Sequence, residues 1–213
     1  MDRLEQDSKM LASLLIEGAS SFPDTATRIL KALSKSRKAK WAVVGGHAVA
    51  LWGSRGVPTL DVDFIGDKES YKIIRDEIGK PYREHTEFAS WKAQGDPGAD
   101  FIHAKLPFLK YALKHSIKSR DMTVINRVGA AVMKLAAVNN IFRVYGKAGK
   151  APQDIADLLN LTVQMTDAEK KEFIKASGLI GDHAVEDAKS VIKHVEDGDA
   201  VTVSIYQIPA KKS

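Results

Sequence analysis

The sequence predicts an α/β (α+β) protein in which a sheet flanked by helices is followed by a mainly helical C-terminal lobe. Three observations support this fold class. Residues 41–66 have the pattern of a strand, a glycine turn, a short helix and a second strand, and residues 85–104 have the pattern of a hairpin. Beyond residue 106 the apolar residues recur mostly at helical spacing. At 213 residues the chain is long enough for two lobes, and we expect a core at 1–110 and a helical lobe at 111–213.

The N-terminal part of the core is expected to be helical. Apolar periodicity predicts one helix over Leu4 to Gly18 and a second over Asp24 to Ser34, the latter entered through Pro23. The basic run at residues 35–40 then separates these helices from the first strand.

The segment from Trp41 to Leu51 predicts a ligand-binding turn. Trp41 to Val44 is a short apolar run typical of a buried strand, and Gly45-Gly46 precede a helix over His47 to Leu51. Glycines allow the backbone to approach a ligand closely, and the free N–H groups at a helix start suit a phosphate group.

The second strand of this segment carries two carboxylates. Asp61 and Asp63 alternate with Leu60, Val62 and Phe64, so the acidic side chains should share one face and the apolar side chains the other. Two like charges on one strand face repel each other unless a cation lies between them. Hard oxygen ligands in this arrangement suit Mg²⁺ or Mn²⁺.

Each half of this pattern has an ordinary structural explanation, since a glycine pair is usually a turn and an Asp-x-Asp pair is usually a solvated strand end. Their combination with Arg55 and Thr59 gives the string GGHAVALWGSRGVPTLDVDF. This string resembles the polymerase-β-like nucleotidyltransferase superfamily, especially its abortive-infection and toxin–antitoxin branch. Many members have Gly-Ser at the turn, where this chain has Gly45-Gly46 before His47, so backbone N–H groups would do more of the phosphate binding.

The resemblance implies a small mixed nucleotidyltransferase sheet and a third carboxylate on a neighbouring strand. Asp100, on the returning strand of the predicted hairpin, is the candidate. In the family, three such carboxylates hold two metal ions, one that activates the attacking hydroxyl and one that neutralises the triphosphate. The resemblance therefore assigns Asp61, Asp63 and Asp100 as catalytic residues and ligands of Mg²⁺ or Mn²⁺. An exposed hairpin residue is the alternative for Asp100.

A downstream helix contains one cation in an otherwise apolar run, VGAAVMKLAAV at residues 128–138. A buried ammonium group is costly unless an anion meets it, although Lys134 could also extend to water. In the resembling family such a lysine contacts the triphosphate and is followed by an arginine and an Asp-x-x-Asp helix, positions that Arg143 and Asp154 match. Asp154 would then orient Lys134 or a base, or else be an acid favoured in the first turn of a helix that begins at Pro152.

Two further residues have more than one interpretation. Arg55 could contact the triphosphate or hold Asp61 and Asp63 in place, because either role uses its planar guanidinium group. His47 could cap or pack the short helix, which is the commoner role, or contact the nucleotide. The nucleotide-binding residues implied by the resemblance are Gly45, Gly46, His47, Arg55, Thr59, Lys134 and Asp154.

The remaining elements are predicted to be helical. A helix over Lys68 to Ile78 should end at Gly79. Further helices are expected over Leu106 to Ile117, Arg127 to Phe142, Pro152 to Val163, Asp167 to Ala176 and Ala184 to Glu196. The alternation of Val201, Val203 and Ile205 predicts a last strand or edge.

Composition narrows the class of protein. The chain has no cysteine, which excludes disulfides and thiolate zinc sites and fits a cytoplasmic protein. Its six histidines show no spacing typical of transition-metal ligands. We expect no membrane association, because no apolar run could span a bilayer and the start MDRLEQDSK lacks the plan of a secretory signal.

The net charge is +5, and basic residues gather in two groups. One is the run at residues 35–40, and the other comprises Lys105, Lys110, Lys114, Lys118 and Arg120. A basic surface would suit a polyanion such as RNA, although solvated helix faces explain the pattern equally well.

The sequence leaves two functions open. The first is transfer of a nucleoside monophosphate from a nucleoside triphosphate such as ATP to a hydroxyl on RNA (transfer RNA included), on a protein or on a small molecule, with release of pyrophosphate. The toxin-like branch also implies an antitoxin-like protein partner. The second is a non-catalytic module that binds nucleotide or nucleic acid on the same fold. Retention of all three carboxylates favours the enzyme, because without a cation their mutual repulsion would only destabilise the fold.

Overall fold

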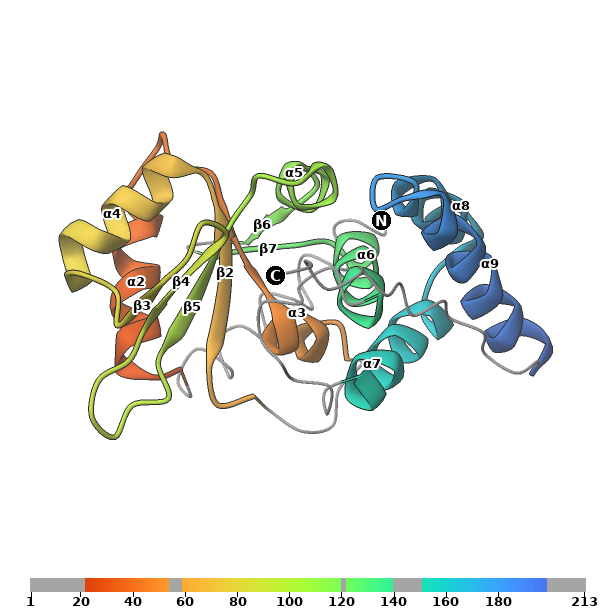
Figure 1. Cartoon of the computed structure of the whole chain (residues 1–213), viewed down its shortest axis with the longest axis horizontal. Coiled ribbons are helices and arrows are strands. Elements are labelled where there is room, and N and C mark those ends of the chain that lie inside the picture. The colour runs from red at the N-terminus through yellow and green to blue at the C-terminus, as the bar shows by residue number, and fades with distance from the viewer. Residues whose placement is uncertain (1–21, 54–58, 120–121, 140–150, 199–213) are drawn as a thin grey trace, which may run out of the picture. The chain divides into compact units, whose positions relative to one another are not determined.

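The computed structural model describes residues 22–53, 59–119, 122–139 and 151–198 (Figure 1). In this part of the chain it contains a mixed seven-stranded sheet and the eight helices α2 to α9. The predicted mixed α/β fold class is thus confirmed. The expected helix over Leu4 to Gly18 and the strand at residues 201–205 lie outside the described residues.

The chain divides into two compact units, Met1–Ala130 and Ala131–Ser213. The expected boundary between residues 110 and 111 falls inside helix α5, Pro107–Lys114. The boundary between the two compact units lies 20 residues further along the chain, between residues 130 and 131. The first unit extends this far because the two strands that follow α5 belong to its sheet.

The sheet joins strands in the order β3-β4-β5-β2-β1-β7-β6. Strand β2 is parallel to β5 and β1 is parallel to β7, whereas all other neighbours are antiparallel. The strands are β1 Trp41–Val44, β2 Val62–Gly66, β3 Arg83–Glu84, β4 Phe88–Trp91, β5 Ala99–His103, β6 Ile117–Ser119 and β7 Met122–Val124.

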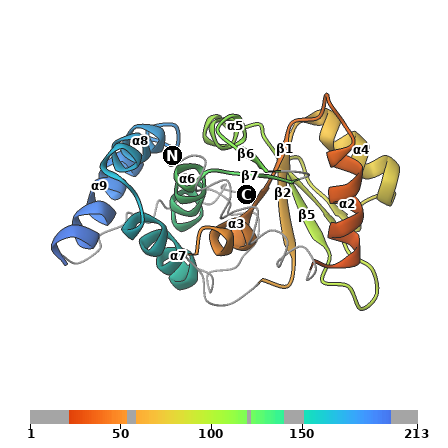
Figure 2. The same ribbon diagram turned by 180° about the vertical axis from the view of Figure 1, so that it is seen from behind.

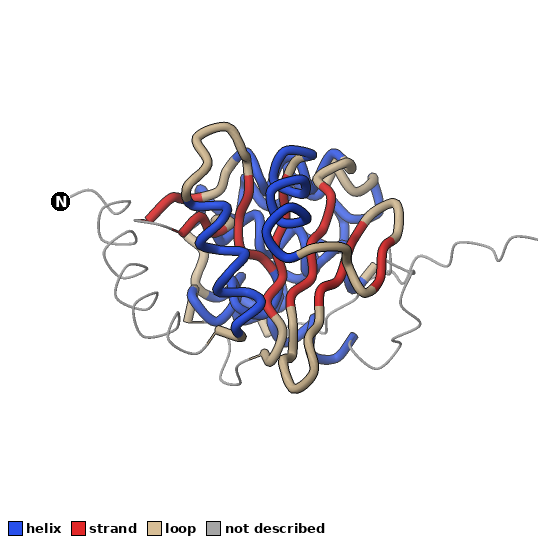
Figure 3. The backbone as a smooth tube through the Cα atoms, turned by 90° about the vertical axis from the view of Figure 1, so that its left-hand side faces the viewer, coloured by secondary structure: helices blue, strands red, loops and turns tan. Residues whose placement is uncertain are grey.

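Helices cover both faces of this sheet. Helices α2 (Asp24–Ser34) and α4 (Lys68–Ile78) lie side by side on one face, as Figures 2 and 3 show. Helices α3 (Gly45–Leu51) and α5 lie on the other face (Figure 2). Because both faces are covered, the central strand β1 is buried along its whole length, which explains its uninterrupted apolar sequence.

Helix α4 begins and ends where the sequence predicts. The Asp67 side chain caps its N-terminus by accepting a hydrogen bond from the Ser70 backbone N–H at 2.9 Å. The helix ends at Gly79, whose φ of 99° is a conformation that favours glycine.

The predicted hairpin is confirmed as β4 and β5, and its turn does more than connect them. In the turn, the Asp96 carboxylate accepts the Gly98 N–H at 2.8 Å. Its other oxygen accepts the Thr25 N–H at 2.8 Å and the Thr25 hydroxyl at 2.6 Å, at the start of α2. Residue Pro23, at the N-cap position of α2, makes no side-chain capping bond. Asp96 therefore caps α2 from a distant part of the chain.

The prediction of one helix over Leu106 to Ile117 is wrong at its C-terminal end, over the last three residues. Helix α5 ends at Lys114, and β6 and β7 follow as an antiparallel pair that the sequence analysis missed. Each of these strands has three residues, too few to show an alternating pattern. They form because β7 pairs with the buried strand β1, at Val43 and Val124.

The described part of the second unit is helical, as predicted. Its described helices are the end of α6 (Arg127–Val138), α7 (Ala151–Val163), α8 (Asp167–Ser177) and α9 (Asp182–Asp197). Helix α8 starts with a capping box, in which the Thr166 hydroxyl accepts the Glu169 N–H at 3.2 Å and the Glu169 carboxylate accepts the Thr166 N–H at 2.8 Å. None of the helices in the described ranges combines the length and apolar composition that a membrane crossing requires.

We predict that Asp96→Asn destabilises the fold in a pH-dependent way. Burial alone would raise the pKa of Asp96, but the hydrogen bonds from Thr25 and Gly98 outweigh it and lower the pKa below its ordinary value. The stabilisation by the carboxylate is therefore complete at neutral pH and is lost as pH falls through the lowered pKa. In urea unfolding at pH 7, Asp96→Asn should have a free energy of unfolding about 1 kcal/mol lower than that of the native protein.

This difference between Asp96→Asn and the native protein should begin to shrink below about pH 4, where the carboxyl group of the unfolded chain takes up a proton, and should be lost as pH falls through the lowered pKa of the folded protein. Asp76→Asn, at an exposed position on α4, serves as the control and should change stability little at either pH. A destabilisation by Asp96→Asn that is the same at pH 7 and pH 3 would contradict the capping role of the charge.

Candidate metal and nucleotide site

Gly45, the first residue of α3 and the residue directly after β1, has a conformation that only glycine adopts easily. Its φ is 64°, and a Cβ atom added there would lie 1.9 Å from the Asp63 Oδ2 atom. The indole N–H of Trp52, at the other end of α3, donates to the Ile125 carbonyl at 3.1 Å and fixes that end against the sheet. The Asp63 carboxylate thus packs directly on the backbone of the turn.

Two parallel strands bring the predicted carboxylates together. Asp63 on β2 is paired with Val44 at the end of β1 and with Asp100 on β5. Residues opposite each other on neighbouring strands point to the same face of a sheet, so Asp63 and Asp100 lie side by side. Asp61 precedes β2, and one carboxylate oxygen from each of the three residues lies within 4.8 Å of the others.

The position of Leu60 corrects one detail of the sequence analysis. Val62 and Phe64 are fully buried as predicted, but Leu60 is 77% exposed and lies before β2. The ladders with β1 and β5 reach only as far as Asp63 and Val62 respectively, so the alternation of faces does not extend to Leu60. Asp61 therefore reaches the cluster from the bend before the strand.

The donor set of this cluster fits a hard divalent cation. It consists of carboxylate oxygens from three half-buried residues, with no sulfur or imidazole ligand among them. Mg²⁺ and Mn²⁺ prefer such ligands, and Mg²⁺ typically takes only a few carboxylates and completes its shell with water and phosphate oxygens. A cation would also relieve the repulsion among three neighbouring negative charges.

Two of the predicted nucleotide-binding residues contact each other. The Thr59 hydroxyl lies 2.7 Å from the His47 Nδ1 atom. The His47 ring also packs edge-on against Phe22, with ring centroids 4.9 Å apart. His47 therefore has the packing role considered for it, and its imidazole holds the Thr59 side chain two residues before Asp61. Arg55 lies outside the described residues.

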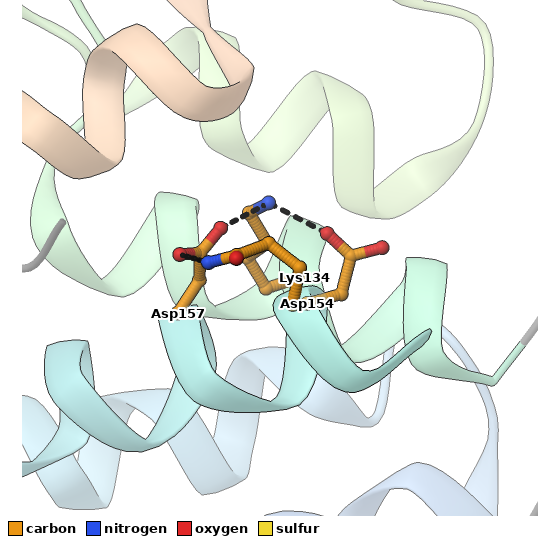
Figure 4. A network of polar contacts seen from close by, with 4 residues as sticks. Lys134, Asp154 and Asp157 are labelled. Carbon is orange, nitrogen blue, oxygen red and sulfur yellow. Dashed lines mark hydrogen bonds and ion pairs between the residues drawn. The ribbon is translucent and has the colours of Figure 1, made fainter. Parts of the chain in front are cut away.

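In the second unit, Lys134 and Asp154 form an ion pair. The Lys134 Nζ atom lies 2.7 Å from Asp154 Oδ1 and 2.7 Å from Asp157 Oδ2 (Figure 4). Only 12% of the Lys134 side chain and 1% of the Asp157 side chain are exposed. Lys134 does not extend to water, because two carboxylates compensate its charge inside the unit.

Asp157 is the second acid of the Asp-x-x-Asp pattern, and the sequence analysis gave it no role of its own. It lies three residues after Asp154 on α7, so both side chains share a helix face. Its other oxygen accepts a hydrogen bond from the Gln153 amide at 2.9 Å. The spacing of the two acids, set against a single lysine in an apolar helix, could have indicated the pair.

Comparisons with known proteins give limited information. A scan against models of protein families and a search of curated protein sequences both find no match to this chain. Among solved structures, the chain is similar to JHP933 from Helicobacter pylori, with a TM-score of 0.42 and 13% identity over 82% of this chain and 91% of that one. It is also similar to an antigenic nucleotidyltransferase-like protein from Paracoccidioides brasiliensis, with a TM-score of 0.40 and 15% identity over 80% of this chain and 94% of that one. Likenesses this weak carry no argument about function.

We predict that Gly45→Ala disrupts the carboxylate cluster, whereas Gly53→Ala does not. Both glycines have a positive φ, 64° and 68°, so each substitution should cost about 1–2 kcal/mol in backbone strain. A Cβ atom at Gly53 would meet nothing within 4 Å, whereas at Gly45 it would overlap the Asp63 carboxylate. In urea unfolding, Gly45→Ala should therefore lower the free energy of unfolding by about 1–3 kcal/mol more than Gly53→Ala does. This extra loss is the usual cost of overpacking. Equal losses for both variants would rule out the close packing of Asp63 on the turn.

The Lys134 network should be sensitive to loss of its most buried acid. Removing one partner of a buried ion pair leaves an uncompensated charge, so Asp157→Ala should lower the free energy of unfolding by about 3 kcal/mol. The Asp154 side chain is 16% exposed, so Asp154→Ala should lower the free energy of unfolding by less than Asp157→Ala does. The control is Glu186→Ala, which breaks an exposed 2.8 Å pair with Lys189 and should cost less than about 1 kcal/mol. Denaturant unfolding of the three variants measures the order of these losses in the free energy of unfolding. Equal losses for Asp157→Ala and Glu186→Ala would contradict the prediction.

Proposed function

We propose that the protein is a cytoplasmic, metal-dependent nucleotidyltransferase that transfers a nucleoside monophosphate from a nucleoside triphosphate to a hydroxyl acceptor and releases pyrophosphate. The observation that carries this proposal is the convergence of Asp61, Asp63 and Asp100, from two parallel strands, beside a glycine turn. The sequence resemblance also supports it, because the same three residues match the carboxylates of that family.

Asp61, Asp63 and Asp100 would hold Mg²⁺ or Mn²⁺. When bound, such an ion polarises phosphate oxygens and favours the deprotonated form of the acceptor hydroxyl. The protein's own contribution is to fix the ligands before substrate arrives. Gly45 leaves space for the Asp63 carboxylate, and the β2–β5 ladder sets Asp100 beside it.

The nucleotide would be bound around the β1–α3 turn. Gly45 and Gly46 would offer backbone N–H groups to the triphosphate, and the His47–Thr59 contact would orient the Thr59 side chain toward it. Arg55 would supply a further positive charge. Asp154 holds Lys134 through their ion pair, and the resemblance assigns Lys134 a contact with the triphosphate.

The resemblance to the toxin–antitoxin branch extends the proposal to the acceptor and to a partner. It favours RNA such as transfer RNA, or a protein, as the hydroxyl acceptor, and an antitoxin-like protein as a regulator. A non-catalytic module that binds nucleotide or nucleic acid on the same fold is the alternative, and it predicts no pyrophosphate release with any acceptor.

The test is transfer of label from each α-labelled nucleoside triphosphate, with Mg²⁺ or Mn²⁺ and total cellular RNA. We predict metal-dependent labelling of RNA or protein by the native chain. The rate of label transfer should fall about a hundredfold or more in Asp61→Asn, Asp63→Asn and Asp100→Asn. Asp76→Asn, remote from the cluster, should retain full activity.

A second readout separates a missing acceptor from a missing metal site. Mg²⁺ or Mn²⁺ should raise the melting temperature of the native protein and of Asp76→Asn but not of the three cluster variants. Without metal, the cluster variants should be at least as stable as the native protein, since each removes a repelling charge. Substantial transfer by Asp61→Asn, or metal stabilisation that survives all three substitutions, would rule out the proposed site.

A further inference from the structure

An open cavity of about 930 Å³ lies in the first unit, beside the start of β1. Most of its wall comes from three segments that are distant in the sequence, and Asp67 and Ala104 complete it. The three segments are residues 34–41, which connect α2 to β1, the C-terminal half of α5, and the strands β6 and β7. The residues that line this cavity do not include Asp61, Asp63 or Asp100.

The wall of this cavity is strongly basic. Six of its residues are cationic, and all six are exposed. They are Lys35, Arg37, Lys40, Lys110, Lys114 and Lys118. Within the described ranges, none of the six forms an ion pair. Their charges therefore accumulate on one concave surface.

One carboxylate, that of Asp67, also lines the cavity, and it is already used in the fold. One of its oxygens accepts the Ser70 N–H at 2.9 Å and the Ser70 hydroxyl at 2.8 Å. The other accepts the backbone N–H of Lys40 at 3.2 Å. Asp67 thus caps α4 and holds the adjacent chain, while the ammonium groups around it remain available to a ligand.

Local hydrogen bonds fix the backbone that carries these cations. The Ser36 side chain accepts the Ala39 N–H at 3.1 Å, and the Asp67 N–H donates to the Lys40 carbonyl at 3.0 Å. On the opposite wall, the Ser116 hydroxyl donates to the Leu113 carbonyl at 2.8 Å. The cations are therefore presented from an ordered surface, which reduces the entropy lost on binding.

The structure answers a question that the sequence left open. Basic residues at 35–40 and at 110–118 could have been solvated on unrelated helix faces, but all of them except Lys38 line one cavity. Lys105, from the second group, is not part of it, because its ammonium donates to the Thr86 carbonyl. Arg120 lies outside the described residues.

We propose that this cavity binds the phosphodiester backbone of a nucleic acid strand. A row of separate cations matches a ligand with one negative charge per phosphate. The concave wall would not lie flat against a membrane surface. The aromatic residue of the wall, Trp41, is only 6% exposed and offers no surface for base stacking, so recognition depends on the backbone and shows little preference for sequence.

The cavity and the carboxylate cluster lie at opposite ends of β1. Trp41 lines the cavity and pairs with Gly66, whereas Val44 pairs with Asp63. Three residues of a strand span about 10 Å. Nucleic acid bound at the cavity would therefore leave the cluster accessible, and its binding needs no metal. The inference does not depend on the transferase activity.

The experiment measures binding of fluorescein-labelled 20-nucleotide single strands of mixed sequence, as RNA and as DNA, by anisotropy in EDTA. The cavity variant is the triple substitution Lys40→Gln, Lys114→Gln and Lys118→Gln, with one change in each wall segment. The matched control is Lys72→Gln, Lys80→Gln and Lys92→Gln, three exposed positions of the same unit outside the cavity. Both triples reduce the formal charge equally.

The cavity variant should bind about a hundredfold more weakly than the native protein at roughly 0.1 M salt, and the slope of log K against log salt should fall by about 2. The control triple should bind like the native protein. Stronger binding of RNA than of DNA would identify contacts to the 2′-hydroxyl, and equal binding would identify the phosphodiester alone as the ligand.

Equal weakening in both triples would show diffuse attraction by net charge and would overturn the proposal, as would failure of the native protein to bind either strand. Circular dichroism and thermal melting establish that both triples are folded. Asp61→Asn, assayed for binding alone, should retain native affinity. If the native protein binds nucleic acid at the cavity but transfers no label, the proposed enzyme is rejected and this site stands. If the native protein transfers label in a metal-dependent way but binds neither strand, this site is rejected and the enzyme stands.

Discussion

The contact between the Gly45 backbone and the Asp63 carboxylate is the constraint on which the candidate site depends. At this point β1 ends, α3 begins and β2 presents its acidic face. Any side chain at position 45 would occupy the space of the Asp63 oxygen. The strand pairing then extends the constraint to Asp100, so that the positions of two of the three carboxylates follow from one turn and one ladder.

The first unit separates opposite charges along its central strand. Carboxylates gather where β1 ends, and uncompensated cations gather where it begins. A buried apolar strand lies between them, so the two groups do not neutralise each other through direct contact. Each can then attract its own ligand, a cation at one end and a polyanion at the other, and the short strand sets the distance between the ligands.

Much of this arrangement could be predicted from local sequence. The short strand before Gly45, the pair of acids around Val62 and the hairpin that carries Asp100 each have a clear local pattern, and α4 is bounded by a capping acid and a glycine. The sequence analysis missed features that arise only from tertiary contacts. Strands β6 and β7 are too short to show a period, and the basic cavity combines residues about 70 positions apart. Asp96 has no role that its neighbours in the sequence reveal, because its partner Thr25 lies 71 residues away.

The two outermost strands of the sheet, β3 and β6, have two and three residues. Strand β3 consists of Arg83 and Glu84, both exposed, and β6 carries the exposed Lys118 at its centre. Unpaired strand edges invite hydrogen bonding with the edges of other chains, and shortness together with charge opposes this. The seven-stranded sheet can therefore remain wide enough to hold its carboxylates in register without offering a template for aggregation.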